Sequence, residues 1–516
     1  MQRGEGSMKI FDQLQGARHK LGKSSTTGLS DSDIKHFLTF DKNLVKAIEY
    51  GLIALKNIED EFSEMLQKPE ETQITDLQKD FINFYDPNTV NPYVAIAAFG
   101  PWIFTSKGSI IYDAGGYGML GLGHNPENIA KIMQNPLVMA NIMTAQFSQM
   151  RFAKKIRQEI GQRGQKNPYQ RFICLNSGSE AMTLAARLAD INTLTQMANG
   201  KTSLGKNYLK TKYLSLTSGF HGRTERPSQF SDSCLKTYKK HLASFQDLDN
   251  LITVPINDTK ALQLAFAQAD KEQVFIEAFI MEPIMGEGNP GAAMSVDFYK
   301  LARELTLKSG ALFIIDSIQA GLRGHGVLSI CDYPGFENII PPDIESFSKA
   351  LNAGQFPFSM LALSKKASSL YKSGIYGNTM TTNPRALDIA SEVLSCLDQR
   401  IRQNIVHQGK AILANLLSLK SEFPDLVTGA QGTGLLFSLE VNKNVKVVGA
   451  DGLEQELRKA GLGVIHGGEN SVRFTPHFAI TDEEIALMMK TLTQVLSLRA
   501  DDLEGEHKLL AVSKIS

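Results

Sequence analysis

The middle of the chain alternates short runs of apolar residues with longer stretches in which apolar residues recur at helical spacing. The short runs are Phe172–Leu175, Tyr213–Leu216, Phe279–Met281, Ala311–Ile315, Ile344–Phe347 and Phe358–Leu363. Ser179–Met197 and Val296–Ser309 lie between them and show the helical spacing. Short buried strands that alternate with helices predict an α/β domain built on a mostly parallel sheet.

The two ends of the chain differ from this middle part. Residues 1–30 are polar and rich in Gly, Ser and Thr, so we expect a mobile terminus there. Apolar residues at helical spacing from Asp33 to Leu66 predict a helical extension. Toward the other end, the pattern predicts a long helix from Pro384 to about Leu416, a strand within Gly432–Val441 and a last helix from Thr481 to Leu498. These C-terminal elements indicate a smaller α+β domain.

The length and charge of the chain narrow the class of protein. A chain of 516 residues is too long for one hydrophobic core, so roughly two to four domains are expected. Lys+Arg and Asp+Glu both total 54, and this balance argues against a general nucleic-acid binder. The sequence has no apolar run of about 18 residues, so we expect no transmembrane helix.

The four cysteines are isolated from one another along the chain. They are Cys174, Cys234, Cys331 and Cys396. None forms a CxxC pair or has metal-ligand spacing with a histidine, so no metal site is expected. Reduced thiols in a long chain are typical of a cytoplasmic protein, which is the location that we predict.

Polar residues at the ends of the predicted strands are the candidates for chemistry. Ligands of parallel sheets bind beyond the carboxyl ends of the strands. Five such segments stand out: Asn176–Ala181, Ser218–Thr224, Glu282–Gly288, Asp316–Gln319 and Ser346–Ala350. Taken singly, each has an ordinary structural explanation, such as a helix cap, a surface turn or a local ion pair.

Two of these segments carry charges beside strongly apolar strands. Asp316 suits either a protonated ring nitrogen or the cap of the next helix. Lys349 is either a nucleophile activated by an apolar setting or one more solvated lysine. Lys365 and Lys366, at the next strand end, are its local competitors.

Two other segments carry groups that suit an anionic, planar ligand. Small residues at 177–179 allow backbone N–H groups at a helix start to approach an anion. Phe220 offers a ring for stacking, and Arg223 matches a carboxylate. Together with a lysine and an aspartate, these are the groups that pyridoxal phosphate chemistry requires.

At these residues the chain resembles the class III (omega) aminotransferases, which are pyridoxal phosphate enzymes of fold type I. The resemblance runs from about Phe84 to Leu498 and is nearest to the ornithine and 4-aminobutyrate aminotransferase branches. The matching segments are Asn176-Ser-Gly-Ser-Glu-Ala181, Glu282-Pro-Ile-Met-Gly-Glu-Gly288, Asp316-x-x-Gln319, Ser348-Lys-Ala-Leu-Asn-Ala-Gly-Gln-Phe-Pro357 and Gly377-Asn-Thr-Met-Thr-Thr-Asn-Pro384.

The resemblance implies a role for each cofactor residue. Lys349 would form the Schiff base with pyridoxal 5′-phosphate and move the proton, and Asp316 would bind the pyridinium nitrogen. Gln319 would contact the 3-oxygen of the ring, and Phe220, next to His221, would stack on the ring. The phosphate would be held by Ser177, Gly178 and Ser179, with Thr379 reaching it from a partner subunit.

Three further residues would bind substrate in such an enzyme. Arg473 looks like the arginine for a substrate α-carboxylate, and Glu287 like the acid that neutralises it when an amino group is presented instead. Arg223 looks like the arginine for the distal carboxylate of glutamate or 2-oxoglutarate. A homodimer or a dimer of dimers is implied, acting on small molecules and on neither nucleic acid nor membrane.

The pattern of predicted elements, together with the resemblance, divides the chain into segments. They are a helical extension at 1–82, a segment at 83–140 that completes the small domain and the active-site entrance, a large cofactor-binding domain at 141–385, a small domain at 386–500 and a polar tail at 501–516.

The chain departs from the family pattern at two places. The usual Asp-Glu-x-Gln is Asp316-Ser317-Ile318-Gln319 here, and the usual Gly-Arg-Thr-Gly is Arg323-Gly324-His325-Gly326. The cofactor-contacting first and fourth positions of the first motif are kept. These departures bear on the identity of the amino donor and leave the cofactor assignment intact.

The leading hypothesis is a ping-pong aminotransferase that moves an amino group from an ω-amino donor to a 2-oxo acid such as 2-oxoglutarate. Ornithine, lysine and 4-aminobutyrate are the donor types considered. A decarboxylase, racemase or aminomutase on the same fold is the alternative within this cofactor class. A non-catalytic scaffold is the alternative from another class.

Overall fold

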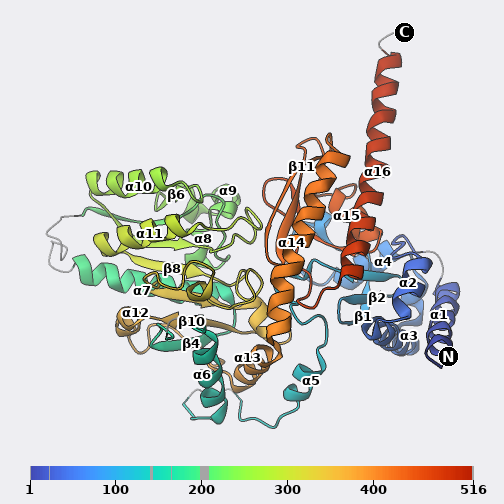
Figure 1. Cartoon of the computed structure of the whole chain (residues 1–516), viewed down its shortest axis with the longest axis horizontal. Helices are drawn as coiled ribbons and strands as arrows, with labels where there is room; N and C mark the ends of the chain where they lie inside the picture. Colours follow the sequence, from blue (N-terminus) through green and yellow to red (C-terminus); the bar gives the residue numbers. More distant parts are fainter. Residues whose placement is uncertain (1, 22–23, 140–142, 164–165, 198–207, 514–516) are drawn as a thin grey trace. The chain divides into compact units, whose positions relative to one another are not determined.

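The computed structural model describes residues 2–21, 24–139, 143–163, 166–197 and 208–513 (Figure 1). These residues fall into two compact units. The smaller unit lies within Met1–Pro126, His407–Gln431 and Phe437–Ser516, and the larger within Glu127–Val406 and Gly432–Leu436. Each unit is described by itself.

The larger unit is built on a seven-stranded sheet. Its strands, in spatial order, are β4 (Arg171–Leu175), β10 (Ser359–Leu363), β9 (Ile344–Phe347), β8 (Leu312–Asp316), β7 (Val274–Met281), β5 (Lys210–Leu216) and β6 (Leu251–Val254). Neighbours pair in parallel except β10, which is antiparallel to both β4 and β9. The prediction of a mostly parallel sheet is therefore confirmed. The half-exposed edge strand β6 was not among the predicted strands.

Helices cover both faces of this sheet (Figure 1). The apolar side of α7 (Gly178–Met197) packs with α12 (Lys365–Leu370) on one face. On the other face, α10 (Thr259–Lys271) and α11 (Val296–Ser309) bury their apolar residues against β5, β7 and β8. The remaining helices of this unit are α5 (Glu127–Met133), α6 (Phe147–Glu159), α8 (Glu225–Ser228), α9 (Asp232–His241) and α13 (Pro384–Cys396).

The single long helix predicted from Pro384 to about Leu416 is wrong, because the structure has two helices there. Leu397, with φ −91° and ψ 76°, ends α13, and α14 (Gln399–Glu422) follows. The Asp398 side chain accepts the N–H of Ile401 at 2.8 Å, as a helix cap does. Apolar residues continue on both sides of this cap, so periodicity alone did not show the break.

The smaller unit contains two four-stranded sheets. The first has the order β1 (Ala95–Phe99), β2 (Trp102–Thr105), β3 (Ile110–Asp113) and β13 (Leu462–Gly463). The second has the order β11 (Val427–Thr433), β12 (Leu436–Val441), β15 (Ser471–Phe474) and β14 (Ile465–Gly467). Two helices of this unit are α15 (Leu453–Lys459) and α16 (Asp482–Ser513). Helix α16 continues past the predicted end at Leu498 through most of the segment predicted as a polar tail.

Short 3₁₀ helices join several of these elements. They are η1 (Pro87–Thr89), η2 (Gly116–Gly118), η3 (Ala243–Phe245), η4 (Ile330–Asp332) and η5 (Lys349–Asn352). The last of them starts directly after β9.

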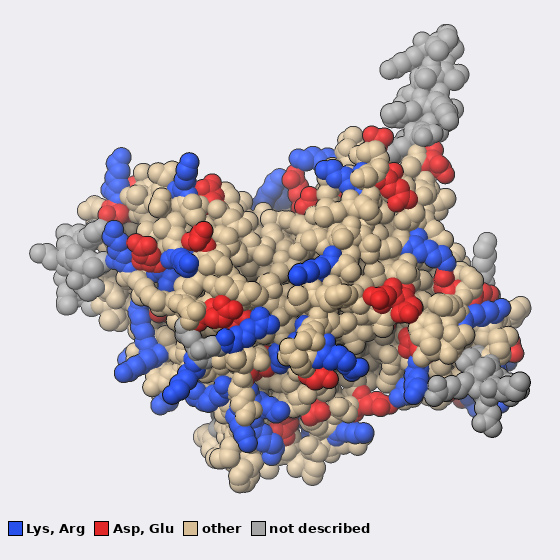
Figure 2. All heavy atoms as spheres, viewed as in Figure 1, with Lys and Arg blue, Asp and Glu red and all other residues tan. Residues whose placement is uncertain are grey.

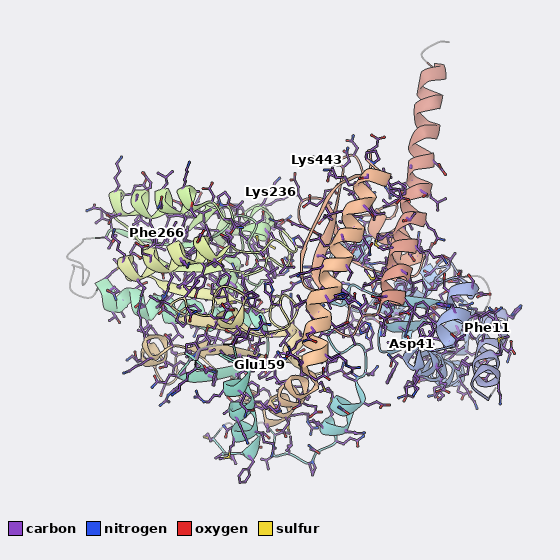
Figure 3. The ribbon with its side chains drawn as sticks, in the orientation of Figure 1. Phe11, Asp41, Glu159, Lys236, Phe266 and Lys443 are labelled. Carbon is purple, nitrogen blue, oxygen red and sulfur yellow. The ribbon has the colours of Figure 1, made fainter. Side chains whose placement is uncertain are left out.

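The N-terminal extension is helical over Gln2–Leu21, so the prediction of a mobile terminus is wrong for these residues. Its helices are α1 (Gln2–Leu21), α2 (Asp31–Leu38), α3 (Lys42–Gln67) and α4 (Glu70–Gln78). Phe11, Leu14 and Leu21 of α1 are buried, and Phe11 is labelled in Figure 3. These residues recur along one side of the helix, a pattern that the polar composition of the segment conceals.

Specific contacts fix the extension against β2 and the turn that follows it. The Trp102 indole donates a hydrogen bond to Asp41 Oδ2 at 2.6 Å (Asp41 is labelled in Figure 3). A Cβ at Gly51 of α3 would lie 2.2 Å from Phe104 Cγ, so only glycine allows this close approach. The buried Lys107 Nζ donates to the carbonyls of Leu21 at 3.1 Å and Leu66 at 2.7 Å. A buried cation thus caps the C-terminal ends of two extension helices.

No helix within the described ranges is long and apolar enough to cross a membrane. On the face shown in Figure 2, blue basic and red acidic side chains are interspersed. This agrees with the equal totals of 54 basic and 54 acidic residues.

We predict that Lys107→Met loosens the extension. The substitution removes two hydrogen bonds made by a charged group and leaves the Leu21 carbonyl without this donor, whereas Gln73 still donates to the Leu66 carbonyl, at a cost of about 2 kcal/mol. Trp102 is the only tryptophan of the chain and is fully buried, so its fluorescence reports on this region. Urea unfolding followed by that fluorescence should show a lower midpoint for Lys107→Met. Lys56→Met, at an exposed position of α3, is the control; equal midpoints for both variants would contradict the prediction.

Candidate active site

Lys349 stands at the carboxyl end of β9 and begins η5. Its φ of 44° turns the chain sharply at this point, a conformation that is uncommon for a residue other than glycine. Its Nζ donates to Gln319 Oε1 at 2.6 Å, and the side chain is half-buried. Lys365 and Lys366, by contrast, are exposed at the start of α12. The geometry therefore separates Lys349 from the two lysines that the sequence left as its competitors.

Asp316 is the last residue of β8, next to β9 in the sheet, and only 4% of it is exposed. Its Oδ2 lies 2.9 Å from His221 Nδ1, and its Oδ1 accepts from Ser346 Oγ at 3.0 Å and from the Ile318 N–H at 3.1 Å. His221 Nε2 in turn lies 3.2 Å from Ser215 Oγ. These bonds satisfy a buried carboxylate and hold it in one orientation.

A second buried carboxyl group, Glu282, lies beside Asp316 and His221. It accepts the N–H of Phe220 at 3.0 Å and of Gly286 at 2.8 Å, and so ties two loops of the site together. Burial raises the pKa of Glu282 to about 7; His221 opposes this shift and Asp316 adds to it. The sequence analysis expected Glu282 to pair with a base, whereas the structure gives it backbone N–H partners.

The start of α7 forms the corner where a phosphate is expected. Ser177 Oγ accepts the Glu180 N–H at 3.2 Å, and Glu180 Oε2 accepts the N–H of Asn176 at 2.9 Å and of Ser177 at 3.2 Å. This is a capping box. The N–H groups of Gly178 and Ser179, at the first turn of α7, are placed to donate to an anion.

Glycines let the loops of the site approach one another closely. A Cβ at Gly178 would lie 2.8 Å from Ile318 Cδ1, and one at Gly222 would lie 2.3 Å from Ser179 Oγ. A Cβ at Gly286 would lie 2.5 Å from Gln319 Oε1, the atom that accepts from Lys349. Side chains at these positions would displace the phosphate corner or the glutamine.

Phe220, Arg223 and Glu287 lie together at the exposed side of the site. The guanidinium carbon of Arg223 lies 5.1 Å from the centre of the Phe220 ring, and its Nη2 donates to Glu287 Oε1 at 3.1 Å. Arg223 Nη1 lies 3.2 Å from the sulfur of Cys234. The sequence analysis assigned Glu287 to Arg473; in the larger unit its partner is Arg223.

Thr379 is exposed on the loop between α12 and α13. The preceding Asn378 donates to Glu180 Oε1 at 2.9 Å and accepts from Asn176 Nδ2 at 3.1 Å. The loop is thus bonded to the start of α7. Its contact with a partner subunit stays a prediction.

Arg473 belongs to the smaller unit. It lies on β15 between Ser438 of β12 and Ile465 of β14, and it is buried. Its role toward a substrate stays a prediction.

The departures from the family motifs have structural partners. The Ser317 hydroxyl donates to Glu345 Oε1 at 2.6 Å, and this buried carboxyl also accepts from Tyr169 and Ser329. Arg323 is fully buried, donates to the Leu435 carbonyl at 3.1 Å, and has its pKa lowered to about 9 by burial. Both residues hold elements of the larger unit together.

Four residues of the site were not assigned from the sequence: Ser215, Cys234, Glu180 and Glu282. The Ser-x-x-Glu spacing of residues 177–180 is a readable capping signal. Cys234 has no such signal, because it meets Arg223 only through the packing of α9. Ser215 lies within β5, where sequence gives no indication of its neighbour.

The arrangement fits pyridoxal 5′-phosphate. Gln319 Nε2 is a buried donor without a hydrogen-bond partner among the described residues, as expected if a ring oxygen accepts from it. Asp316 is a buried anion that suits a protonated ring nitrogen. The glycine-lined start of α7 suits a phosphate, and Lys349 supplies the amine.

We predict that the titration of Glu282 makes the protein less stable as pH rises through neutrality. Its pKa is about 7 when folded, against 4.5 ordinarily, so the folded state binds the proton more tightly over this range. Relative to Glu282→Gln, the free energy of unfolding of the wild type should fall by about 2 kcal/mol between pH 5 and pH 8. Glu304→Gln, exposed on α11, is the control. A difference independent of pH would contradict the raised pKa.

Comparisons with known proteins cover most of the chain. The model of the family described as aminotransferase class-III matches residues 84–496. An acetylornithine aminotransferase of Lactococcus lactis is 29% identical over 78% of this chain and 97% of its own length. An ornithine aminotransferase of Bacillus cereus is 26% identical over 63% of this chain and 74% of its own.

Solved structures show the same fold. The ornithine aminotransferase of Toxoplasma gondii superposes with a TM-score of 0.70 at 22% identity, covering 86% of this chain and 99% of that one. The resemblance inferred from the motifs is thereby confirmed. Since the family model spans most of the chain, the protein belongs to the class-III aminotransferases, which depend on pyridoxal 5′-phosphate.

Proposed function

We propose that this aminotransferase moves the amino group of an ω-amino donor of the ornithine type to 2-oxoglutarate by a ping-pong mechanism. The names of the similar proteins, ornithine and acetylornithine aminotransferases, support the donor class. The observation that carries the proposal is the Arg223–Glu287 pair at 3.1 Å beside the Phe220 ring. An arginine and an acid at one place suit substrates that present a carboxylate in one half-reaction and an amine in the other.

Different residues of the larger unit would hold different parts of the cofactor. Asp316, oriented by His221 and Ser346, would hold the ring nitrogen in its protonated form. Gln319 Nε2 would donate to the ring oxygen, and Phe220, held through its N–H by Glu282, would cover one ring face. When bound, pyridoxal phosphate supplies an electron sink for the carbanion that forms when substrate loses a proton.

Lys349 is the proposed acid–base group. Its Nζ would anchor the cofactor aldehyde, and once released it would take the proton from the donor carbon and return it at the cofactor. Gln319 Oε1, 2.6 Å from this nitrogen, orients it. The sharp backbone turn at Lys349 fixes where the side chain starts.

Three charged residues are proposed to recognise substrates. Arg223 would bind the distal carboxylate of the acceptor, and Arg473 the α-carboxylate. Glu287 would neutralise an arginine when the substrate offers an amine instead of a carboxylate. In the structure, Arg223 forms an ion pair with Glu287. This pair supports a mechanism in which a substrate carboxylate replaces the Glu287 carboxylate at the arginine.

We also propose a homodimer, in which Thr379 contributes to the phosphate site of the partner subunit. The exposed position of Thr379, on a loop bonded to the phosphate corner, supports this arrangement. The four free cysteines support a reducing, cytoplasmic location.

We predict that Lys349→Arg abolishes both the visible absorption band of the protein loaded with pyridoxal phosphate and its transamination activity. Arginine is never deprotonated in proteins and cannot replace the lysine amine. The absorption spectrum and a glutamate-release assay measure these effects, which should be losses of at least about 10³-fold in rate. Lys365→Arg should keep both. A normal band in Lys349→Arg would refute the assignment.

We predict that an ω-amine donor converts 2-oxoglutarate to glutamate when mixed with the loaded protein. Ornithine, N-acetylornithine, lysine and 4-aminobutyrate are compared by the glutamate they produce. One donor should produce more glutamate than the others. The site fixes the distance between the residues that bind the donor's carboxylate and the position of the reacting amine, so one donor length fits best. If the visible band forms but none of the four yields glutamate, the donor class is wrong, although the cofactor assignment stands.

A further inference from the structure

The guanidinium group of Arg223 interacts with Glu287, Cys234 and Phe220, and also with Tyr238 of α9. Its Nη2 meets Glu287 Oε1 at 3.1 Å, its Nη1 meets Cys234 Sγ at 3.2 Å, and its carbon lies 5.1 Å from the centre of the Phe220 ring. The arginine side chain keeps 38% of its surface exposed, so one edge of it faces solvent. An incoming carboxylate can reach that edge.

Cys234 is the fixed member of this group. It is 7% exposed, on α9, and the start of α9 is bonded to the loop that carries Phe220 and Arg223. Ser231 Oγ accepts the His221 N–H at 2.9 Å and donates to the Gly222 carbonyl at 3.0 Å. Asp232 Oδ2 accepts the Ser218 N–H at 2.7 Å. The sulfur and the base of Arg223 are therefore parts of one bonded assembly.

Glu287 differs from Cys234 in exposure and in chemistry. Its side chain is 27% exposed, on the turn after β7, and its carboxylate is a strong acceptor that neutralises the arginine. A thiol is a weak acceptor without charge. Cys234 can thus hold Nη1 in place and leave the positive charge of Arg223 available to a substrate.

We propose that Cys234 is a positioning residue for the acceptor half-reaction. It holds Nη1 of Arg223 so that the Nη2 edge faces the distal carboxylate of a dicarboxylate acceptor. That carboxylate then replaces the Glu287 carboxylate at Nη2. This inference rests on the proposed function of Arg223. A long arginine side chain that is already held in its binding orientation loses less conformational freedom when the ligand arrives.

The test compares Cys234→Ala, Cys234→Ser and the control Cys396→Ala in the protein loaded with pyridoxal phosphate. Glutarate, a dicarboxylate that cannot be transaminated, is the probe, and its Kd is measured by calorimetry. Cys234→Ala should raise this Kd and the KM for 2-oxoglutarate about fivefold, the value of one modest hydrogen bond. The kcat should stay within about twofold, because Cys234 contacts Arg223 and none of the residues proposed to hold the reacting atoms.

Cys234→Ser should restore most of the affinity, since its hydroxyl accepts the same N–H. Cys396→Ala should match the wild type. If Cys234→Ala leaves the Kd for glutarate unchanged, or lowers kcat as strongly as it raises the KM for 2-oxoglutarate, the positioning role is overturned.

Arg223→Ala separates this inference from the function on which it rests. If Arg223→Ala leaves glutarate binding unchanged, the acceptor site proposed for Arg223 is wrong, and the role of Cys234 fails with it. If Arg223→Ala weakens glutarate binding and Cys234→Ala does not, only the positioning role fails. An unchanged visible band in each variant shows that the cofactor site is intact.

Discussion

The burial of Asp316 at the end of a central strand is the constraint on which the site depends. A carboxylate with 4% exposure is costly unless its oxygens are bonded. The sheet meets this need from neighbouring strands: Ser346 comes from β9, and His221 comes from the loop after β5 and is itself bonded to Ser215. The parallel order of β9, β8, β7 and β5 brings these groups, with Lys349 and Glu282, to one edge. The strand order thus both stabilises the buried Asp316 carboxyl group and places the other residues of the site beside it.

The sequence was most informative where polar residues directly follow apolar strands. Lys349, Asp316 and the small residues at 177–179 follow apolar strands, so their meeting at one edge follows from a parallel sheet. The strands β4, β5, β8 and β9 could be read from their apolar runs. The motif order then pointed to a family, and the family fixed the cofactor.

The sequence was least informative where contacts depend on packing between distant segments. Cys234 meets Arg223 only because α9 is bonded back to the loop after β5, and no local spacing indicates this. The helix α1 was missed because its few apolar residues are spread through a polar segment, and only their common side reveals them. The break at Leu397 was hidden because apolar periodicity continues across it.

The position of Glu345 shows how a buried carboxyl group can lie beside a motif position that has lost its own acid. The family has an acidic residue where this chain has Ser317, and by sequence alone the acid is lost. In space, the Glu345 carboxyl group of β9 accepts from the Ser317 hydroxyl at 2.6 Å, and burial raises the pKa of that carboxyl group to about 7. A carboxyl group therefore remains beside that position although the linear motif lacks it. A comparison of the residues that surround a motif position in space would therefore identify family members that a comparison of the linear motif misses.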